Sequence, residues 1–462
     1  MIDKTLKFLK YFILLFVFLA IVGCAASHQE KLYYVAPTQI PHTNRLMKTA
    51  GFWIGQHPFP DRVILNPDEI QEFNRVIREE LKLTRDLSQY PSETSGKELR
   101  NTLKKVLDKF SQQDLYLDYL KASAQFYRDM MDQMNMDAIP ETIKVKFGFV
   151  VHLTDHRFFP TTRSLYAKPE DIDFDELQNS TLDVGRGVAI LHQSRDKKWY
   201  YVETSLTSGW ARVEDIALTD QEKIKELIQE KNPVVAISAK ADIFLDSQMT
   251  KPYDYVRMGA RFLPESTPSV NNPDAVAIML PTRDDQGHAI LRTAYMNAAE
   301  VHQGYLTYSP RTIIEQAFKL LNAPYGWGGM NGEQDCSRFI QEVFATTGVF
   351  LPRNSTDQKK VGHILAEFKE GTPLEGKINL LNTQAVGATT LLYLKGHNML
   401  FLGTVDKNPY AIHATWAYRE RGPGADIVRV LNRVVVSDLS LGEGSRKGSL
   451  LKRLLVVNHI GN

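Results

Sequence analysis

Cysteine is scarce in this chain: only Cys24 and Cys336 occur among its 462 residues. Two cysteines can form at most one disulfide, which excludes a small disulfide-stabilised scaffold. If Cys24 is modified, Cys336 is a lone thiol. A lone cysteine is often a small, buried, unreactive side chain, so the residues around Cys336 must decide between an inert and a reactive role.

An excess of one charge is also missing, because 55 Lys and Arg are balanced by 54 Asp and Glu, giving a net charge of +1. A protein that holds a phosphate polymer usually presents a broad basic surface, so we expect no nucleic-acid partner. The chain contains no low-complexity stretch. It is too long for one ordinary core, and about two to four domains are expected.

The N-terminus has an apolar run, Tyr11 to Val22, that is shorter than the roughly 20 residues of a membrane-spanning helix. Lysines precede this run and small residues follow it, which is typical of a secretory signal. The residues "IVGC" ending at Cys24 resemble the lipobox of bacterial lipoproteins, which implies a signal peptide over 1–23 and lipid on Cys24. We therefore expect an exported, membrane-anchored lipoprotein with a lipidated, extended tether over 24–60. An uncleaved anchor and an ordinary signal peptide remain alternatives.

The region 61–143 is predicted to be a helical N-terminal domain. Asn66 before Pro67 is a good helix start, and apolar residues then recur at helical spacing up to Leu81. Two further helices are expected over 97–110 and 114–134.

The next regions are predicted to be two small β-barrels, over 144–219 and 231–303, joined by a charged helix over 220–230. Short apolar runs alternate there with Gly, Asp and Ser turns. The stretch "KWYYVETSLTSGWARVEDIAL" at 198–218 resembles bacterial SH3-like barrels, which have five strands. Such barrels are usually binding or scaffold modules.

The segment around Cys336 carries the strongest chemical signal. An amphipathic helix over 311–321 leads into a Gly-rich loop, and Asp335-Cys336-Ser337 opens a second helix. A helix N-terminus favours a thiolate over a thiol and offers backbone N–H groups to an oxyanion. A nucleophile needs both effects, whereas a structural cysteine needs neither.

A thiolate also needs a base that a third group orients. His397 opens an apolar run that reads as a strand, and His413 lies in the next strand after a turn at 406–409. Side chains alternate between the two faces of a strand, and residues directly opposite each other on paired strands lie on the same face. The two histidines, both odd-numbered, therefore share a face only if odd-numbered residues pair with odd-numbered ones, for instance Phe401 with His413. The sequence does not fix that register.

These motifs resemble the NlpC-type cell-wall peptidases. The resemblance rests on "PYGWGG…DCSRF" within 324–339, "LPRNS" at 351–355, "LKGHNMLFLG" at 394–403 and "HATW" at 413–416. It is closest to the branch with a helical N-terminal domain and two SH3-like domains, and it implies a multidomain α+β fold with a papain-like catalytic domain over 308–462. It also implies Cys336 as nucleophile, His397 as general base and His413 as the residue that orients the base.

Members that resemble this chain hydrolyse the bond between γ-D-glutamate and a diamino acid in peptidoglycan stem peptides, often when the N-terminal L-Ala is free. The resemblance implies that Asp335 faces the substrate amine and that Ser337 contacts the peptide. Tyr325 and Trp327 are expected to wall the substrate cleft, and Tyr166 of the first barrel, or less favourably Arg163, to close it. The chain departs from the pattern at Lys395 and after Trp416, which leaves details of the cleft open.

Two other functions remain possible from the sequence: an amidase or acyltransferase on the same scaffold, and a non-catalytic wall-binding lipoprotein. No metal or cofactor is expected. His152 and His156 have the spacing of a zinc helix, but they lie in a predicted strand and turn, and the Glu of His-Glu-x-x-His is missing. The expected partners are stem peptides or muropeptides and, through the lipid, a membrane; the chain is expected to be a monomer.

Overall fold

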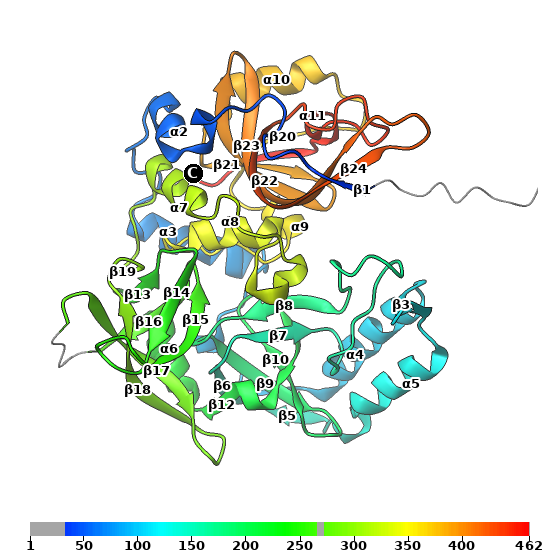
Figure 1. The fold of residues 1–462 in the computed structure, drawn as a ribbon. Coiled ribbons are helices and arrows are strands. Elements are labelled where there is room, and N and C mark those ends of the chain that lie inside the picture. Colours follow the sequence, from blue (N-terminus) through cyan, green and yellow to red (C-terminus); the bar gives the residue numbers. More distant parts are fainter. Residues whose placement is uncertain (1–32, 266–271, 462) are drawn as a thin grey trace, which may run out of the picture.

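The computed structural model describes residues 33–265 and 272–461 (Figure 1). The predicted signal peptide, Cys24 and the start of the tether lie outside these residues. Among the residues described, none of the helices has both the length and the apolar character needed to span a bilayer. In the residues described, helices are combined with three β-sheets of seven strands and two β-sheets of two strands.

The N-terminal helices α2 (Ala50–Gln56) and α3 (Pro67–Arg75) pack against the C-terminal part of the chain. The predicted start of α3 is confirmed: the Asn66 side chain accepts the N–H of Glu69, whose carboxylate accepts the N–H of Asn66 in return. Trp53 of α2 is fully buried and stacks near Tyr410 of the C-terminal sheet.

Helices α4 (Gly96–Ser111) and α5 (Ala124–Gln133) pack instead against the first β-domain. The expected single helical domain over 61–143 is therefore divided between two cores. The prediction of one helix over 114–134 was wrong at its start, where β3 (Tyr116–Leu117) and β4 (Leu120–Lys121) form a hairpin. Asp118 and Tyr119 have positive φ there, which ends a helix and suits a tight turn.

The first β-domain is a seven-stranded antiparallel sheet of order β12-β6-β9-β10-β11-β7-β8. The predicted strands around residues 146, 187, 199 and 210 are confirmed, while β7 and β8, which are rich in polar residues, were not predicted. The bounds are β6 (Lys146–Val150), β7 (Thr154–Arg157), β8 (Gln178–Leu182), β9 (Gly187–Gln193), β10 (Trp199–Glu203), β11 (Ser208–Arg212) and β12 (Ile216–Thr219). A short pair, β2 (Glu93–Ser95) and β5 (Thr142–Lys144), lies beside it.

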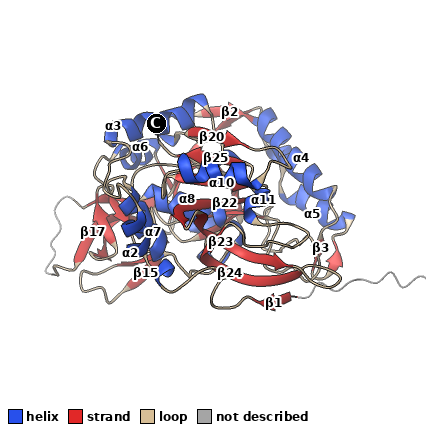
Figure 2. Ribbon diagram, turned by 90° about the horizontal axis from the view of Figure 1, so that it is seen from above, coloured by secondary structure: helices blue, strands red, loops and turns tan. Residues whose placement is uncertain are grey.

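The predicted linker helix is observed as α6 (Gln221–Gln229), and the second β-domain follows with strand order β15-β14-β18-β17-β16-β13-β19. Its strands are β13 (Val234–Ala236), β14 (Lys240–Phe244), β15 (Pro252–Arg257), β16 (Arg261–Pro264), β17 (Ala275–Arg283), β18 (Ala289–Asn297) and β19 (Val301–Gln303). Figure 2 shows α4 and α5 at one end of the molecule and β17 of this domain at the other.

The C-terminal sheet has the order β1-β24-β23-β22-β21-β25-β20. Helix α8 packs on β22 and β23 and lies between this sheet and the two β-domains (Figure 1). The strands are β1 (Tyr33–Val35), β20 (His363–Glu367), β21 (Thr390–Leu394), β22 (His397–Val405), β23 (Asn408–Glu420), β24 (Ile427–Asp438) and β25 (Val456–His459). The helices are α7 (Pro310–Lys319), α8 (Cys336–Ala345), α9 (Ser355–Gln358), α10 (Leu374–Thr383) and α11 (Leu450–Arg453).

Candidate active site

Cys336 is the first residue of α8, as predicted, and is 7% exposed. Asp335 caps the helix by accepting the N–H of Arg338 at 2.9 Å. Backbone N–H groups of Asn398 and Ser337 reach the sulfur and favour the thiolate. Burial and then the charge of Asp335 outweigh them and raise the pKa of the Cys336 thiol to about 12. The N–H of Ser337 therefore acts in the direction predicted for the helix N-terminus, while burial and the charge of Asp335 act against it.

His397 and His413 share one face of the β22–β23 hairpin. Odd-numbered residues pair with odd-numbered ones, as this condition requires, although Phe401 lies opposite Ala411 and not His413. Nε2 of His397 lies 2.9 Å from Nδ1 of His413. Within residues 33–265 and 272–461, Nδ1 of His397 has no hydrogen-bond partner and is free to take a proton.

A residue that the sequence analysis missed completes this chain of polar groups. Oγ of Ser437, on β24, lies 3.0 Å from Nε2 of His413. It was missed because a single Ser in a valine-rich strand gives no sign of its partner until the register with β23 is known. In that register Val435 is opposite His413, so Ser437 lies on the same face, one diagonal step away.

Both histidines are held neutral. Burial, followed by the neighbouring His413, Arg453 and Lys447, lowers the pKa of His397 well below its usual value of 6.5. Burial lowers the pKa of His413 to about 3. A buried thiol and a neutral imidazole are groups suited to nucleophilic catalysis in which a proton passes from sulfur to nitrogen during attack.

Asp335 is turned towards Arg353, the arginine of the "LPRNS" motif. Two hydrogen bonds of 3.0 and 2.6 Å join the guanidinium to both carboxylate oxygens, and Ser337 donates a third of 3.0 Å. Burial would raise the pKa of Asp335, but the charge of Arg353 outweighs it and the pKa is lowered. Nε of Arg353 also donates to Ser180 of β8, at 3.1 Å, which connects the first β-domain to this site.

The Gly-rich loop before α8 lies directly against β8. Gly328 and Gly329 have positive φ, and a Cβ on either would approach Gln178 or Thr181 to within 2.6 Å, so the close contact requires glycine. Thr181 donates to the carbonyl of Gly329 at 2.7 Å. The first β-domain therefore fixes the loop that carries Tyr325 and Trp327.

Aromatic residues from both domains form one wall. The ring centroid of Phe174 lies 5.4 Å from that of Trp327, 5.1 Å from that of Trp416 and 6.5 Å from that of Tyr325. The sequence analysis missed Phe174, which lies in the loop between β7 and β8. The backbone of Tyr166, the residue expected to close the cleft, forms a β-bridge with Tyr116, and the role of its side chain stays a prediction.

A second face of α8 carries a buried ion network. Arg338 lies 2.5 Å from Asp183 of the first β-domain and 2.7 Å from Glu342. Asp183 also accepts from Arg257 of the second β-domain at 2.8 and 2.9 Å. Burial raises the pKa of Asp183, but Arg257 and Arg338 together outweigh it and keep the carboxyl ionised. This network ties the nucleophile helix to both β-domains.

Comparison with known proteins places these features in families. Residues 164–212 match the SH3 domain of SH3b1 type, and residues 322–412 match the NlpC/P60 family. The bifunctional muramidase/DL-endopeptidase CwlT of Bacillus subtilis is 40% identical over 63 residues, which are 13% of this chain and 19% of that protein. The gamma-D-glutamyl-L-lysine dipeptidyl-peptidase of the same organism is 38% identical over 64 residues, 14% of this chain and 19% of that protein.

These matches span about a fifth of the length of those two relatives. The solved structure of an NlpC/P60 endopeptidase from Photobacterium damselae subsp. piscicida is similar over nearly the whole chain. It covers 92% of this chain and 98% of its own, with a TM-score of 0.73 and 19% identity, which establishes a shared fold. The chain therefore carries an NlpC/P60 family domain preceded by an SH3 domain, within a multidomain α+β fold.

Proposed function

We propose that this protein is a peptidoglycan hydrolase, a cysteine endopeptidase that cuts the bond between γ-D-glutamate and the diamino acid of stem peptides. The observation that carries the proposal is the position of Cys336 at the start of α8, where the backbone N–H of Asn398 reaches its sulfur. His397 directly precedes Asn398, and its ring contacts His413, which in turn contacts Ser437. The names of the two Bacillus relatives, a DL-endopeptidase and a γ-D-glutamyl-L-lysine peptidase, support the substrate class.

In the proposed mechanism, Nδ1 of His397 takes the thiol proton as the sulfur attacks the γ-glutamyl carbonyl. Thiol and imidazole are both neutral at rest, so the ion pair forms only during attack. In the first turn of α8, Asp335 accepts the N–H groups of Arg338 and Phe339, whereas the N–H of Cys336 has no partner among the described residues and is available to the oxyanion. The imidazolium then protonates the leaving amine, and water activated by the same ring hydrolyses the thioester.

His413 orients His397 through the 2.9 Å contact with its Nε2, and Ser437 in turn holds His413. His413 and Ser437 are both uncharged. Their contacts therefore fix the tautomer and the ring orientation of His397 more than they stabilise its imidazolium by charge.

We also propose that Asp335 binds the free N-terminal amine of the substrate. A carboxylate offers about four lone-pair sites. Oδ1 already accepts from Arg353, Ser337 and the N–H of Arg338, whereas Oδ2 accepts only from Arg353. Oδ2 therefore has room for one ammonium donor. Tyr325 and Trp327 would wall this end of the cleft.

Finally, we propose that the chain is exported and anchored through lipid on Cys24, and that it acts as a monomer. The signal-like N-terminus supports export, and so does the similarity to a relative named as a muramidase and DL-endopeptidase.

The test is mass spectrometry of L-Ala-γ-D-Glu-meso-diaminopimelate incubated with the protein from Ala25 onward and with its Cys336→Ala variant. We expect L-Ala-D-Glu from the first and no product from the second. Thermal unfolding of both proteins checks that the variant is folded. Release of whole stem peptides from muropeptides would favour an amidase, and the absence of any product from either substrate would refute the endopeptidase.

A further inference from the structure

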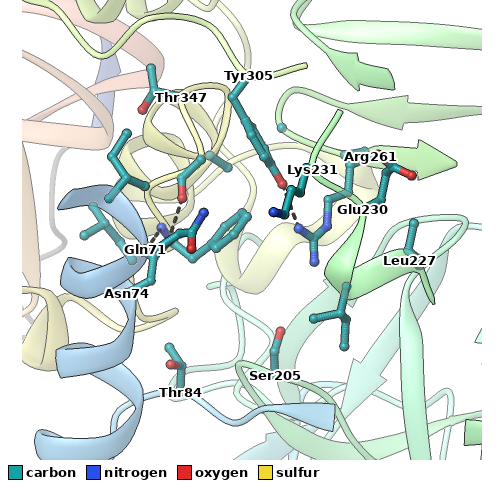
Figure 3. Close-up of a pocket in the computed structure, with 18 of the residues that line it drawn as sticks. Gln71, Asn74, Thr84, Ser205, Leu227, Glu230, Lys231, Arg261, Tyr305 and Thr347 are labelled. Carbon is teal, nitrogen blue, oxygen red and sulfur yellow. Dashed lines mark hydrogen bonds between the residues drawn. The ribbon is translucent and has the colours of Figure 1, made fainter. Parts of the chain in front are cut away.

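A cavity of about 1650 Å³ lies where α3, the two β-domains and α8 meet (Figure 3). On α8 it is lined by Arg338, Gln341, Glu342 and Ala345, so it is on the side of the helix opposite the sulfur. Cys336 and the two site histidines do not line it. The cavity is therefore separate from the site described above.

Its acidic residues at α8 are already neutralised. Asp183 is bound by Arg257 and Arg338, and Glu342 by Arg338. At the rim, the half-buried Glu230 accepts the N–H of Asn232. Within the described residues, none of these carboxylates is paired with the cations that line the cavity from the β-domains, since Arg257 is not a lining residue.

Two of those cations lack a carboxylate partner. Arg186, partly buried, makes no side-chain hydrogen bond or ion pair with the part of the chain that the structure describes. Arg261 donates to the Tyr305 hydroxyl at 2.7 Å and lies 5.0 Å from the Phe350 ring, both neutral groups. Figure 3 shows Arg261, Tyr305 and Lys231 directed towards the same part of the cavity.

Arg186 is in an unfavourable position without a ligand. Burial, and then the positive charges of Arg338 and Arg261, lower its pKa to about 10, and only Asp183 opposes them. The Arg186 guanidinium is half-buried and has no partner among the described residues, and a carboxylate that matches its planar donors would give it charge-assisted hydrogen bonds.

We propose that this cavity is a second ligand site, which binds a stem peptide through a carboxylate held by Arg186 and Arg261. The volume is larger than that of ordinary small-molecule pockets, roughly 300–1,000 Å³, so it admits a peptide as well as an ion. Tyr305 and Leu227 supply apolar surface for the rest of the ligand. The identity of the peptide rests on the proposed function, but the carboxylate site itself does not.

The test is isothermal titration of L-Ala-γ-D-Glu-meso-diaminopimelate into the Cys336→Ala protein, in which the substrate is not cut. We expect two sites. Adding Arg186→Gln should remove one of them or weaken it at least about tenfold, which is the value of one lost charged hydrogen bond. Arg261→Gln should weaken the same site. Arg212→Gln, at a half-buried arginine of the first β-domain that pairs with Glu214, should leave both sites unchanged.

One site or none in the Cys336→Ala protein would overturn the proposal, as would two sites that Arg186→Gln leaves unchanged. Titration with inorganic phosphate serves as the ion control: phosphate binding that depends on Arg186, without a second peptide site, also overturns it. Thermal unfolding shows whether each variant is folded. If the Arg186→Gln variant is unfolded, the Arg261→Gln variant tests the second site in its place. Release of L-Ala-D-Glu by the unmodified protein tests the endopeptidase activity at Cys336, whereas the titration tests the second ligand site. Failure of one proposal is therefore distinguishable from failure of the other.

Discussion

The indole Nε1 of Trp416 donates a 2.7 Å hydrogen bond to Oδ2 of Asp173, joining β23 of the C-terminal sheet to the loop between β7 and β8. Phe174, the next residue of that loop, contacts Trp416 and Trp327. Asp175 fixes the loop from behind by binding Arg157 and the N–H groups of Leu165 and Leu177. The first β-domain therefore supplies one wall of the candidate cleft in a defined position.

Removing the ring of Phe174 should weaken substrate binding more than catalysis. We expect Phe174→Ala to raise KM about tenfold, because an apolar contact of this size contributes about 1–3 kcal/mol to recognition, with a smaller effect on kcat. Steady-state kinetics on the tripeptide measure both. Phe158→Ala is the matched control, since Phe158 lies in the same loop but its ring contacts Phe110 of α4. Equal effects of the two substitutions would refute the assignment of Phe174 to the wall.

Loss of His413 should lower kcat strongly, because His397 loses the group that fixes its tautomer. We expect His413→Ala to reduce kcat about 100-fold or more, and Ser437→Ala, which acts through His413, about tenfold, or ~1.4 kcal/mol. The KM should change little in either variant. Ser440→Ala is the control: Ser440 follows the same strand but donates to Asp438 and not to His413. A normal kcat for Ser437→Ala would remove Ser437 from the proposed chain.

The acid limb of the pH–rate profile should move when a cation near His397 is removed. Burial is the main cause of the low pKa of His397, and the charges of Arg453 and Lys447 add to it. A neighbouring cation disfavours the imidazolium, so Arg453→Gln should raise the pKa of His397 and shift the acid limb of kcat/KM to higher pH, while the plateau stays within about twofold. Arg446→Gln, whose side chain bonds the carbonyl of Gly424, should not shift it. A shift to lower pH would contradict this account.

Breaking the ion network behind α8 should destabilise the protein. Asp183→Asn leaves Arg257 and Arg338 without their shared carboxylate, and loss of one partner of a buried pair costs about 3–5 kcal/mol. Denaturant unfolding measures the change in the free energy of unfolding. Glu214→Gln, which breaks an exposed pair with Arg212, should cost at most about 1 kcal/mol. Similar losses in the two variants would show that the network contributes little.

The local features of the site could be predicted from the sequence. Capping residues and apolar spacing locate α3 and α8, because helix starts depend on residues within one turn. The parity argument for His397 and His413 also needed only the two-residue repeat of a strand. The structure gives the pairing of odd-numbered residues with odd-numbered ones that places both rings on one face.

Contacts between distant segments could not be predicted. Phe174 lies in a loop without strand or helix periodicity, and nothing local indicates that it meets Trp327 and Trp416. The pairing of Asp335 with Arg353 was missed for the same reason. The raised pKa of Cys336 depends on burial by several elements, whereas the sequence shows only the helix N-terminus.

The way in which the two ends of the chain share one core determines when the protein can finish folding. Trp53, Leu65 and Phe73 are buried together with Ile340 of α8 and Leu400 of β22. His42 bonds Asp438 across 396 positions of sequence. The first helices therefore have no complete surface to pack on until the last strands are made, and such long-range closure slows folding. If the C-terminal region were separated from the rest of the chain, this core would be exposed to solvent. A chimaera that takes this region from a relative must therefore take the N-terminal helices of that relative as well.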